Sequence, residues 1–181
     1  KIIVTNSQKA RLAVDERYQE RQAQCQEALH DLQTVIAIQN LSELTADVFE
    51  QVQEMIRRPV CLRRARHAET ENQRTIQAVE ALNKGDIREF GQLMNASHLS
   101  LKEDFEVSCE ELDILVEEAW EIEGVLGSRM MGAGFGGCTI SIVENDAVNE
   151  FVSRVGSHYK ERTGRTAEFY IMETGNGASE V

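Results

Sequence analysis

Residues 128–143 contain the densest run of glycine in the chain. Four of the twelve glycines fall within the six residues 132–137, which read Gly-Ala-Gly-Phe-Gly-Gly. Because glycine has no Cβ, such a run can adopt positive φ angles and lets a backbone or an anion approach closely. The run could therefore hold phosphate groups, or it could be no more than a tight turn. The spacing alone leaves both interpretations open.

Gly132, Gly134 and Gly137 also match G-x-G-x-x-G, the spacing of the dinucleotide-binding fingerprint. That fingerprint requires a strand before the glycines and a helix after them, because the N-terminus of the helix holds the pyrophosphate. Here the next segment, residues 138–143, is short and rich in β-branched residues, which predicts a strand. We therefore expect a glycine bend between two strands rather than a dinucleotide-binding turn.

A second group of chemically capable residues stands at the start of a predicted helix. Residues of one helical face recur every three or four positions, and this face comprises Tyr18, Arg21, Cys25, Leu29, Leu32 and Ile36. Tyr18 and Arg21 are too polar for ordinary core positions, so they could face a site. The alternative for Tyr18 is an aromatic ring that packs at the helix start with its hydroxyl satisfied.

Further polar residues lie on the two helices that follow. Arg63–His67 makes one end of a long helix basic, which is usually a solvated face. Glu71 and Asn72, on the same helix, are expected to tie it to its neighbours. His98 has no second histidine or carboxylate at metal-binding spacing beside it, so a satisfied core histidine is the expectation.

The composition limits the classes of protein that the chain can be. It has 181 residues, 41% of them hydrophobic and 28% charged, which is enough for one globular domain with a real core. We expect neither a membrane span nor a signal peptide. Four widely separated cysteines argue for reduced thiols in a cytoplasm and against a zinc site. The net charge of −12 disfavours nucleic acid and anionic lipid as partners.

Periodicity and turn residues predict an α+β fold, with helices covering a sheet. The chain starts, without methionine, in what reads as a buried strand, which suggests a piece of a longer polypeptide. The four expected strands are residues 2–5, 128–131, 138–143 and 167–172. The expected helices are residues 18–36, 42–56, 60–83, 86–101, 106–122 and 146–164.

Local signals predict how several of these helices begin and end. Gly85 is expected to close one helix and Asp86 to cap the next. Ser108 and Glu111 predict a capping box, and Asp146 is the expected N-cap of the last helix. In the second helix, the residues expected to face inward are Val48, Val52, Met55 and Ile56. Four glutamates, at 117, 118, 121 and 123, are expected to form a solvated acidic face.

The glycine run carries a resemblance to a known family. Arg129-Met130-x-Gly-Ala-Gly-Phe-Gly-Gly-Cys138 resembles the third signature motif of the galactokinases, within the superfamily that also holds homoserine and mevalonate kinases. Four further segments are similar to galactokinases, in the same order. They are Asn6-Ser7 with Arg11, Tyr18, Arg21 and Cys25; Arg66-His67-x-x-x-Glu71-Asn72; Met94-Asn95-x-Ser97-His98-x-Ser100-Leu101; and the tail Gly175-Asn176-Gly177-Ala178.

The resemblance implies that residues 1–181 are the C-terminal kinase domain of a galactokinase. It implies an antiparallel four-stranded sheet covered by helices, of the ferredoxin-like kind. The N-terminal ATP and sugar domain, with the catalytic aspartate and the phosphate loop, would lie before Lys1. The family transfers the γ-phosphoryl group of ATP to galactose with Mg²⁺, so galactose, ATP and the missing domain are the implied partners, in the cytoplasm.

The resemblance also assigns roles within this chain. It implies that Tyr18 contacts the sugar, and that six residues support the nucleotide phosphate loop: Gly132, Ala133, Gly134, Phe135, Gly136 and Gly137. No catalytic residue or metal ligand is expected here, so the isolated chain should be inactive. Two alternatives remain: a non-enzymatic sensor of galactose and ATP, and another small-molecule kinase of the superfamily. The residues before Lys1 would distinguish them.

Overall fold

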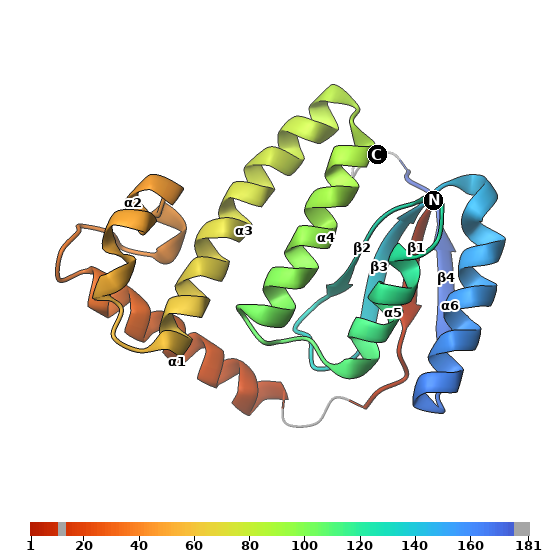
Figure 1. Cartoon of the computed structure of the whole chain (residues 1–181), viewed down its shortest axis with the longest axis horizontal. Helices are drawn as coiled ribbons and strands as arrows, with labels where there is room; N and C mark the ends of the chain where they lie inside the picture. The colour runs from red at the N-terminus through yellow and green to blue at the C-terminus, as the bar shows by residue number, and fades with distance from the viewer. Residues whose placement is uncertain (11–13, 176–181) are drawn as a thin grey trace, which may run out of the picture. The chain divides into compact units, whose positions relative to one another are not determined.

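The computed structural model describes residues 1–10 and 14–175, which form two compact units. One unit comprises Lys1–Arg11 and Ser108–Val181, and we call it the sheet unit. The other comprises Leu12–Val107, and we call it the helical unit. The helical unit is therefore inserted in the sequence between the first strand and the rest of the sheet unit (Figure 1).

The sheet unit follows the order strand, helix, strand, strand, helix, strand. Its elements are β1 (Ile2–Asn6), α5 (Glu110–Trp120), β2 (Val125–Met131), β3 (Cys138–Val143), a 3-10 turn (Asn145–Ala147), α6 (Val148–Thr163) and β4 (Glu168–Met172). The four strands form one antiparallel sheet in the order β2-β3-β1-β4. This is the α+β arrangement expected from the sequence.

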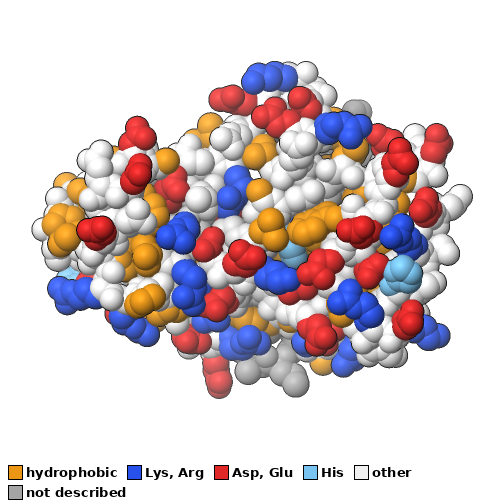
Figure 2. All heavy atoms as spheres, in the orientation of Figure 1, with side chains coloured by type: hydrophobic (Ala, Val, Ile, Leu, Met, Phe, Trp, Pro, Cys, Tyr) orange, Lys and Arg blue, Asp and Glu red, His pale blue; other side chains and the backbone are white. Residues whose placement is uncertain are grey.

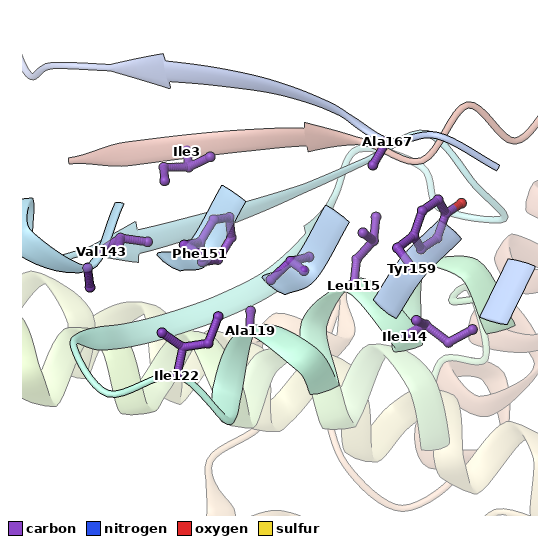
Figure 3. Packing of buried hydrophobic residues seen from close by; sticks show 11 residues of the cluster. Ile3, Ile114, Leu115, Ala119, Ile122, Val143, Phe151, Tyr159 and Ala167 are labelled. Carbon is purple, nitrogen blue, oxygen red and sulfur yellow. The ribbon is translucent and has the colours of Figure 1, made fainter. Parts of the chain in front are cut away.

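The core of the sheet unit lies between one face of the sheet and the helices α5 and α6 (Figure 3). Alternation along β1 and β3 turns Ile3 and Val143 toward the helices, because successive side chains of a strand point to opposite faces. The helices contribute the buried side chains Ile114, Leu115, Ala119, Phe151, Val155 and Tyr159. In α5 the buried residues are Leu112, Ile114, Leu115, Val116 and Ala119.

Polar contacts join α5 and α6 at the edge of this core. Glu118 accepts hydrogen bonds from Nδ1 of His158 at 2.6 Å and from Arg162 at 3.2 Å. Burial opposes the charge of Glu118, but these two hydrogen bonds hold the pKa of its carboxyl below the ordinary value. The expectation of a solvated acidic face is therefore wrong for Glu118, which links two helices, although Glu121 and Glu123 are exposed.

The helical unit contains four α-helices and two 3-10 turns within its described residues. They are α1 (Val14–Leu32), a 3-10 turn (Leu41–Glu43), α2 (Ala46–Val52), a second 3-10 turn (Gln53–Met55), α3 (Pro59–Lys84) and α4 (Ile87–Glu103). The core is formed by buried apolar residues from α1, the 41–56 segment and the first turns of α3; they are Ala28, Leu29, Leu32, Leu41, Leu44, Phe49, Ile56, Cys61 and Ala65.

Arg64 is the largest side chain in the chain's described part that is fully buried, with 1% of its surface exposed. Its guanidinium donates to the side-chain oxygen of Gln24, to the backbone carbonyl of Asp104 and to the carboxylate of Glu106. A buried cation is costly unless hydrogen bonds replace its water shell. Arg64 thereby ties α1 and α3 to the segment that follows α4.

Several expected helix boundaries are confirmed, because the signals behind them are local. Gly85 follows α3 with a φ of 74°, and Gly164 follows α6 with a φ of 71°, as left-handed C-terminal caps. Asp86 caps α4 by accepting a hydrogen bond from the amide of Glu89 at 2.9 Å.

Other local expectations are wrong. Residues 42–56 are not one helix, and within them Phe49 is buried while Val48 and Met55 are exposed. The capping box does not form, because Ser108 donates to Asp113 at 2.5 Å and Glu111 pairs with a lysine distant in sequence. A 3-10 turn precedes α6, so its N-cap is Ala147 instead of Asp146.

The burial of Arg64 predicts a stability difference between neighbouring arginines. Arg64→Ala removes three hydrogen bonds and leaves the Gln24 oxygen unpaired, so it should lower the free energy of unfolding by about 2–4 kcal/mol. Arg63→Ala is the matched control: its guanidinium contacts the same Glu106 at 3.1 Å but is 37% exposed, and the loss should stay below about 1 kcal/mol. Urea unfolding of both variants measures this. Equal losses would contradict the argument.

Candidate functional site

The glycine run connects two adjacent antiparallel strands. Met131 of β2 pairs with Cys138 of β3 as the last register pair, so residues 132–137 form the bend between them. Five of these six residues have positive φ: 75° at Gly132, 83° at Gly134, 57° at Phe135, 128° at Gly136 and 89° at Gly137. No helix follows the run, so the expected bend is confirmed.

Phe135 is the only non-glycine residue of the bend whose backbone has a left-handed conformation. Only 2% of its surface is exposed, and Gly134 and Gly136 beside it are also buried. A left-handed conformation costs a non-glycine residue about 1–2 kcal/mol, which burial of the aromatic ring can offset. Phe135 thus anchors the middle of the bend, while Gly132, Ala133 and Gly137 keep exposed surface.

The bend is held against the segment that follows β1. The amide of Ser7 donates to the carbonyl of Gly137 at 2.8 Å, and the hydroxyl of Tyr159 on α6 donates to the carbonyl of Ser7 at 2.6 Å. A Cβ built on Gly136 would lie 3.2 Å from the side chain of Lys9. Glycine at 136 therefore permits both the φ of 128° and the approach of Lys9.

An open pocket of about 430 Å³ lies where the bend meets this segment. It is lined by Asn6, Gln8, Lys9, Ala10, Gly137 and Cys138. Amide side chains, an ammonium group and a backbone without a side chain are groups that can donate hydrogen bonds to an anion. The arrangement can therefore accommodate phosphate oxygens.

The charges beside the pocket favour an anion more than the overall charge does. Nζ of Lys9 lies 2.6 Å from one oxygen of Glu111, and Nε of Arg165 lies 3.9 Å from the other. The hydrogen bond to Glu111 raises the pKa of Lys9, so the lysine is charged at neutral pH. Two cations share one carboxylate, which leaves a local positive charge in a chain whose net charge is −12.

Tyr18, the other expected site residue, belongs to the helical unit, whereas this pocket belongs to the sheet unit. Tyr18 lies on α1 of the helical unit, and 50% of its surface is exposed. Arg21, one turn further on, is buried and donates to the carbonyls of Phe105 and Glu106 at 2.9 and 3.2 Å. Arg21 therefore supports the backbone after α4, and the expectation that it could face a site is wrong.

The motif residues of α3 and α4 make structural contacts within the helical unit. Ser97 donates to Glu71 at 2.7 Å, Arg74 donates to the other oxygen of Glu71 at 2.5 Å, and Asn72 donates to the carbonyl of Ser42 at 3.0 Å. These bonds join α3 to α4 and to the 3-10 turn at 41–43. The tying role expected of Glu71 and Asn72 agrees with these contacts.

Sequence reasoning missed three residues of the site. Lys9 stands in a basic turn that the sequence marks, but Glu111 and Arg165 are distant in sequence, and nothing local connects them with the bend. Two of the motif segments reach beyond what the structure covers: Arg11 and residues 176–178 lie outside the described residues.

Two searches of the described residues concern metals and membranes. Within residues 1–10 and 14–175, no group of three or more His, Cys, Asp or Glu side chains could hold a metal ion. None of the helices described for the chain is both long and apolar enough to cross a bilayer. Figure 2 shows acidic and basic side chains interspersed over the face it presents.

Comparison with known proteins gives consistent matches. Residues 78–161 match the family described as GHMP kinases C terminal. A galactokinase of Clostridium acetobutylicum is 50% identical over 181 residues, which is 100% of this chain and 46% of that protein. A galactokinase of Fusobacterium nucleatum is 52% identical over 99% of this chain and 46% of its own length. The chain thus spans about half the length of these relatives.

Solved structures agree with the sequence matches. The crystal structure of Lactococcus lactis galactokinase complexed with galactose superposes with a TM-score of 0.93 at 44% identity, covering 99% of this chain and 46% of that one. The L. major mevalonate kinase in complex with R-mevalonate has a TM-score of 0.58 at 21% identity, covering 90% of this chain and 38% of that one. The second match shows a shared fold only.

The bend geometry predicts that two glycine substitutions differ in cost. Gly136→Ala forces a side chain into a φ of 128° and against Lys9, so the free energy of unfolding should fall by about 2–3 kcal/mol. Gly164→Ala is the control, because its φ of 71° is the common left-handed value and nothing lies within 4 Å; it should cost about 1 kcal/mol. Urea unfolding compares them, and an equal or larger cost at Gly164 would refute the crowding.

Proposed function

We propose that this chain, whose residues 78–161 match the GHMP kinases C terminal family, is the C-terminal half of an ATP-dependent galactokinase. The parent protein would phosphorylate galactose to galactose 1-phosphate. The observation that carries the proposal is the match to galactokinases over the whole chain, at about half of their length. The N-terminal ATP and sugar domain belongs to the proposal as well.

In this proposal the chain contributes one wall of the active site. Phosphoryl transfer depends on positioning and on electrostatic stabilisation of the phosphate oxygens more than on covalent chemistry by the protein. The bend at 132–137 would lie behind the phosphate loop of the other half. Its glycines have no side chains, so they would permit close approach of that loop. Lys9 and Arg165 would add positive charge near the same place.

Tyr18 is proposed as a contact of the sugar. Its side chain is half exposed on the first turns of α1, so its hydroxyl is available to a ligand, and its ring offers an apolar face to one side of a pyranose. The aspartate that aligns the sugar hydroxyl would come from the N-terminal half. Mg²⁺ would be held by that half and by the phosphates of ATP, whose negative charge it would neutralise.

The setting of the parent protein is also a proposal. All four cysteines are free thiols, which suits a cytoplasmic enzyme. A non-enzymatic sensor of galactose and ATP is the alternative from another functional class, and it would share this C-terminal half. An assay of galactose phosphorylation by the full-length parent distinguishes an enzyme from a sensor, because a sensor would bind both ligands without forming product.

The proposal predicts that the isolated chain is inactive. Purified residues 1–181 should form no galactose 1-phosphate from ATP and galactose, because the aspartate and the phosphate loop are proposed to lie in the other half. The full-length parent, assayed in parallel with labelled ATP, is the positive control. Product formed by the isolated chain would overturn this division of labour, and no product from the parent would favour the sensor.

The proposal also predicts a selective effect of substituting Tyr18 in the parent. Tyr18→Phe removes one hydroxyl contact to the sugar, so kcat/KM for galactose should fall by about 10-fold, the effect of one lost hydrogen bond in a site. The KM for ATP should stay within about 2-fold. Tyr170→Phe is the control, because Tyr170 is equally exposed but lies on β4. An equal change for both substrates, or no change, would remove Tyr18 from the sugar site.

A further inference from the structure

A second pocket lies within the helical unit, away from every residue assigned so far to phosphate or sugar. It has a volume of about 530 Å³ and opens between the start of α2 and the middle of α3, which lie side by side (Figure 1). Its lining comes from the N-cap and first two residues of α2 and from one face of α3; the residues are Thr45, Ala46, Asp47, Glu69, Thr70, Gln73, Arg74 and Gln77.

Glu69 is the unusual member of this lining. Only 4% of its surface is exposed, and among the residues that the structure describes its carboxyl interacts with Arg74 through charge, without a hydrogen bond. Leaving a buried carboxylate without a hydrogen bond is costly, and native proteins rarely do so without a reason. Burial raises the pKa of Glu69, although the positive charge of Arg74 acts in the opposite direction. The raised pKa reflects the cost of burying the charged carboxylate.

The neighbouring charges decide which ligand would suit this carboxyl. Arg74 is already engaged, since its guanidinium donates to Glu71 at 2.5 Å and to the hydroxyl of Thr70 at 2.8 Å. Asp47 adds a second carboxylate to the lining. With Glu71 neutralising Arg74, the pocket keeps an excess of negative charge, which favours a cation.

The remaining lining groups narrow the class of cation. Amide oxygens of Gln73 and Gln77 and the hydroxyl of Thr45 can accept hydrogen bonds from an N–H donor. An ammonium group has three donors, so it can bond to several of these acceptors at once.

We propose that this pocket binds a small organic cation through a primary ammonium group, with Glu69 as its buried counter-ion and Asp47 at the rim. The proposal is independent of the kinase activity, because it uses no residue assigned to the bend or to the sugar. The ligand would supply hydrogen-bond donors to Glu69. Binding would hold α2 against α3, since the lining comes from both helices.

The test measures binding of 1,4-diaminobutane to the full-length protein that carries this chain, by isothermal titration calorimetry at low salt. We expect saturable binding with a Kd of about 1 mM or tighter, as a charge pair with several hydrogen bonds provides. The uncharged analogue 1,4-butanediol should not bind. Binding of both compounds with similar Kd would overturn the assignment to a cation.

Two carboxylates on the same helix give a matched pair of variants. Glu69→Gln keeps the shape of the side chain and removes its charge, and should weaken binding by about 10-fold or more. Glu80→Gln changes an exposed glutamate of α3 outside the pocket, and should leave the Kd within about 2-fold. Equal Kd values for both variants would mean non-specific attraction to an acidic protein, and would overturn the proposal.

A location measurement keeps the test decisive if Glu69→Gln fails to fold. Hydrogen–deuterium exchange of the unmodified protein, with and without 1,4-diaminobutane, should show slower exchange in peptides that cover residues 45–52 and 69–77. The peptide that covers the bend at 132–137 should be unchanged. Protection at the bend, or none at α2 and α3, would refute the site.

Discussion

The backbone between β2 and β3 turns through conformations that side chains rarely permit, and the sheet unit depends on that turn. Five of the six bend residues have positive φ, and the value of 128° at Gly136 is one that an L side chain rarely adopts. The turn brings β3 back beside β2, where it also pairs with β1. The hydrogen bond from Ser7 to Gly137 then places Lys9 beside the bend. The sheet topology and the candidate phosphate pocket thus share one cause.

Both units contain charged side chains in unusual surroundings. Beside the bend, Lys9 and Arg165 share the carboxylate of Glu111, so an acidic chain presents a positive region to an anion. In the helical unit, Arg64 is buried and donates three hydrogen bonds, whereas Glu69 is buried without a hydrogen bond from any described residue. Hydrogen bonds offset the cost of burying Arg64, and the burial of Glu69 is the basis of the cation site that we propose.

Features set by neighbouring residues were predicted from the sequence more reliably than features that depend on distant residues. Gly85 and Asp86 mark helix ends through bonds within a few residues, and both were predicted. Ser108 and Glu111 carried an equally local signal, yet Lys9 takes Glu111 because the fold brings it there. Residues 42–56 had helical periodicity, but burial of Phe49 against α1 and α3 selected a short helix between two 3-10 turns. Tertiary packing outweighed propensity in both cases.

Local sequence patterns were sufficient for the α+β class and the bend, because glycine content and strand alternation are properties of neighbouring residues. Only the tertiary structure decided that Arg21 supports a backbone segment, that Glu118 joins two helices, and that Lys9 and Arg165 meet at Glu111. It also revealed the burial of Glu69. Burial and pairing of charges depend on residues distant in sequence, so no local pattern encodes them.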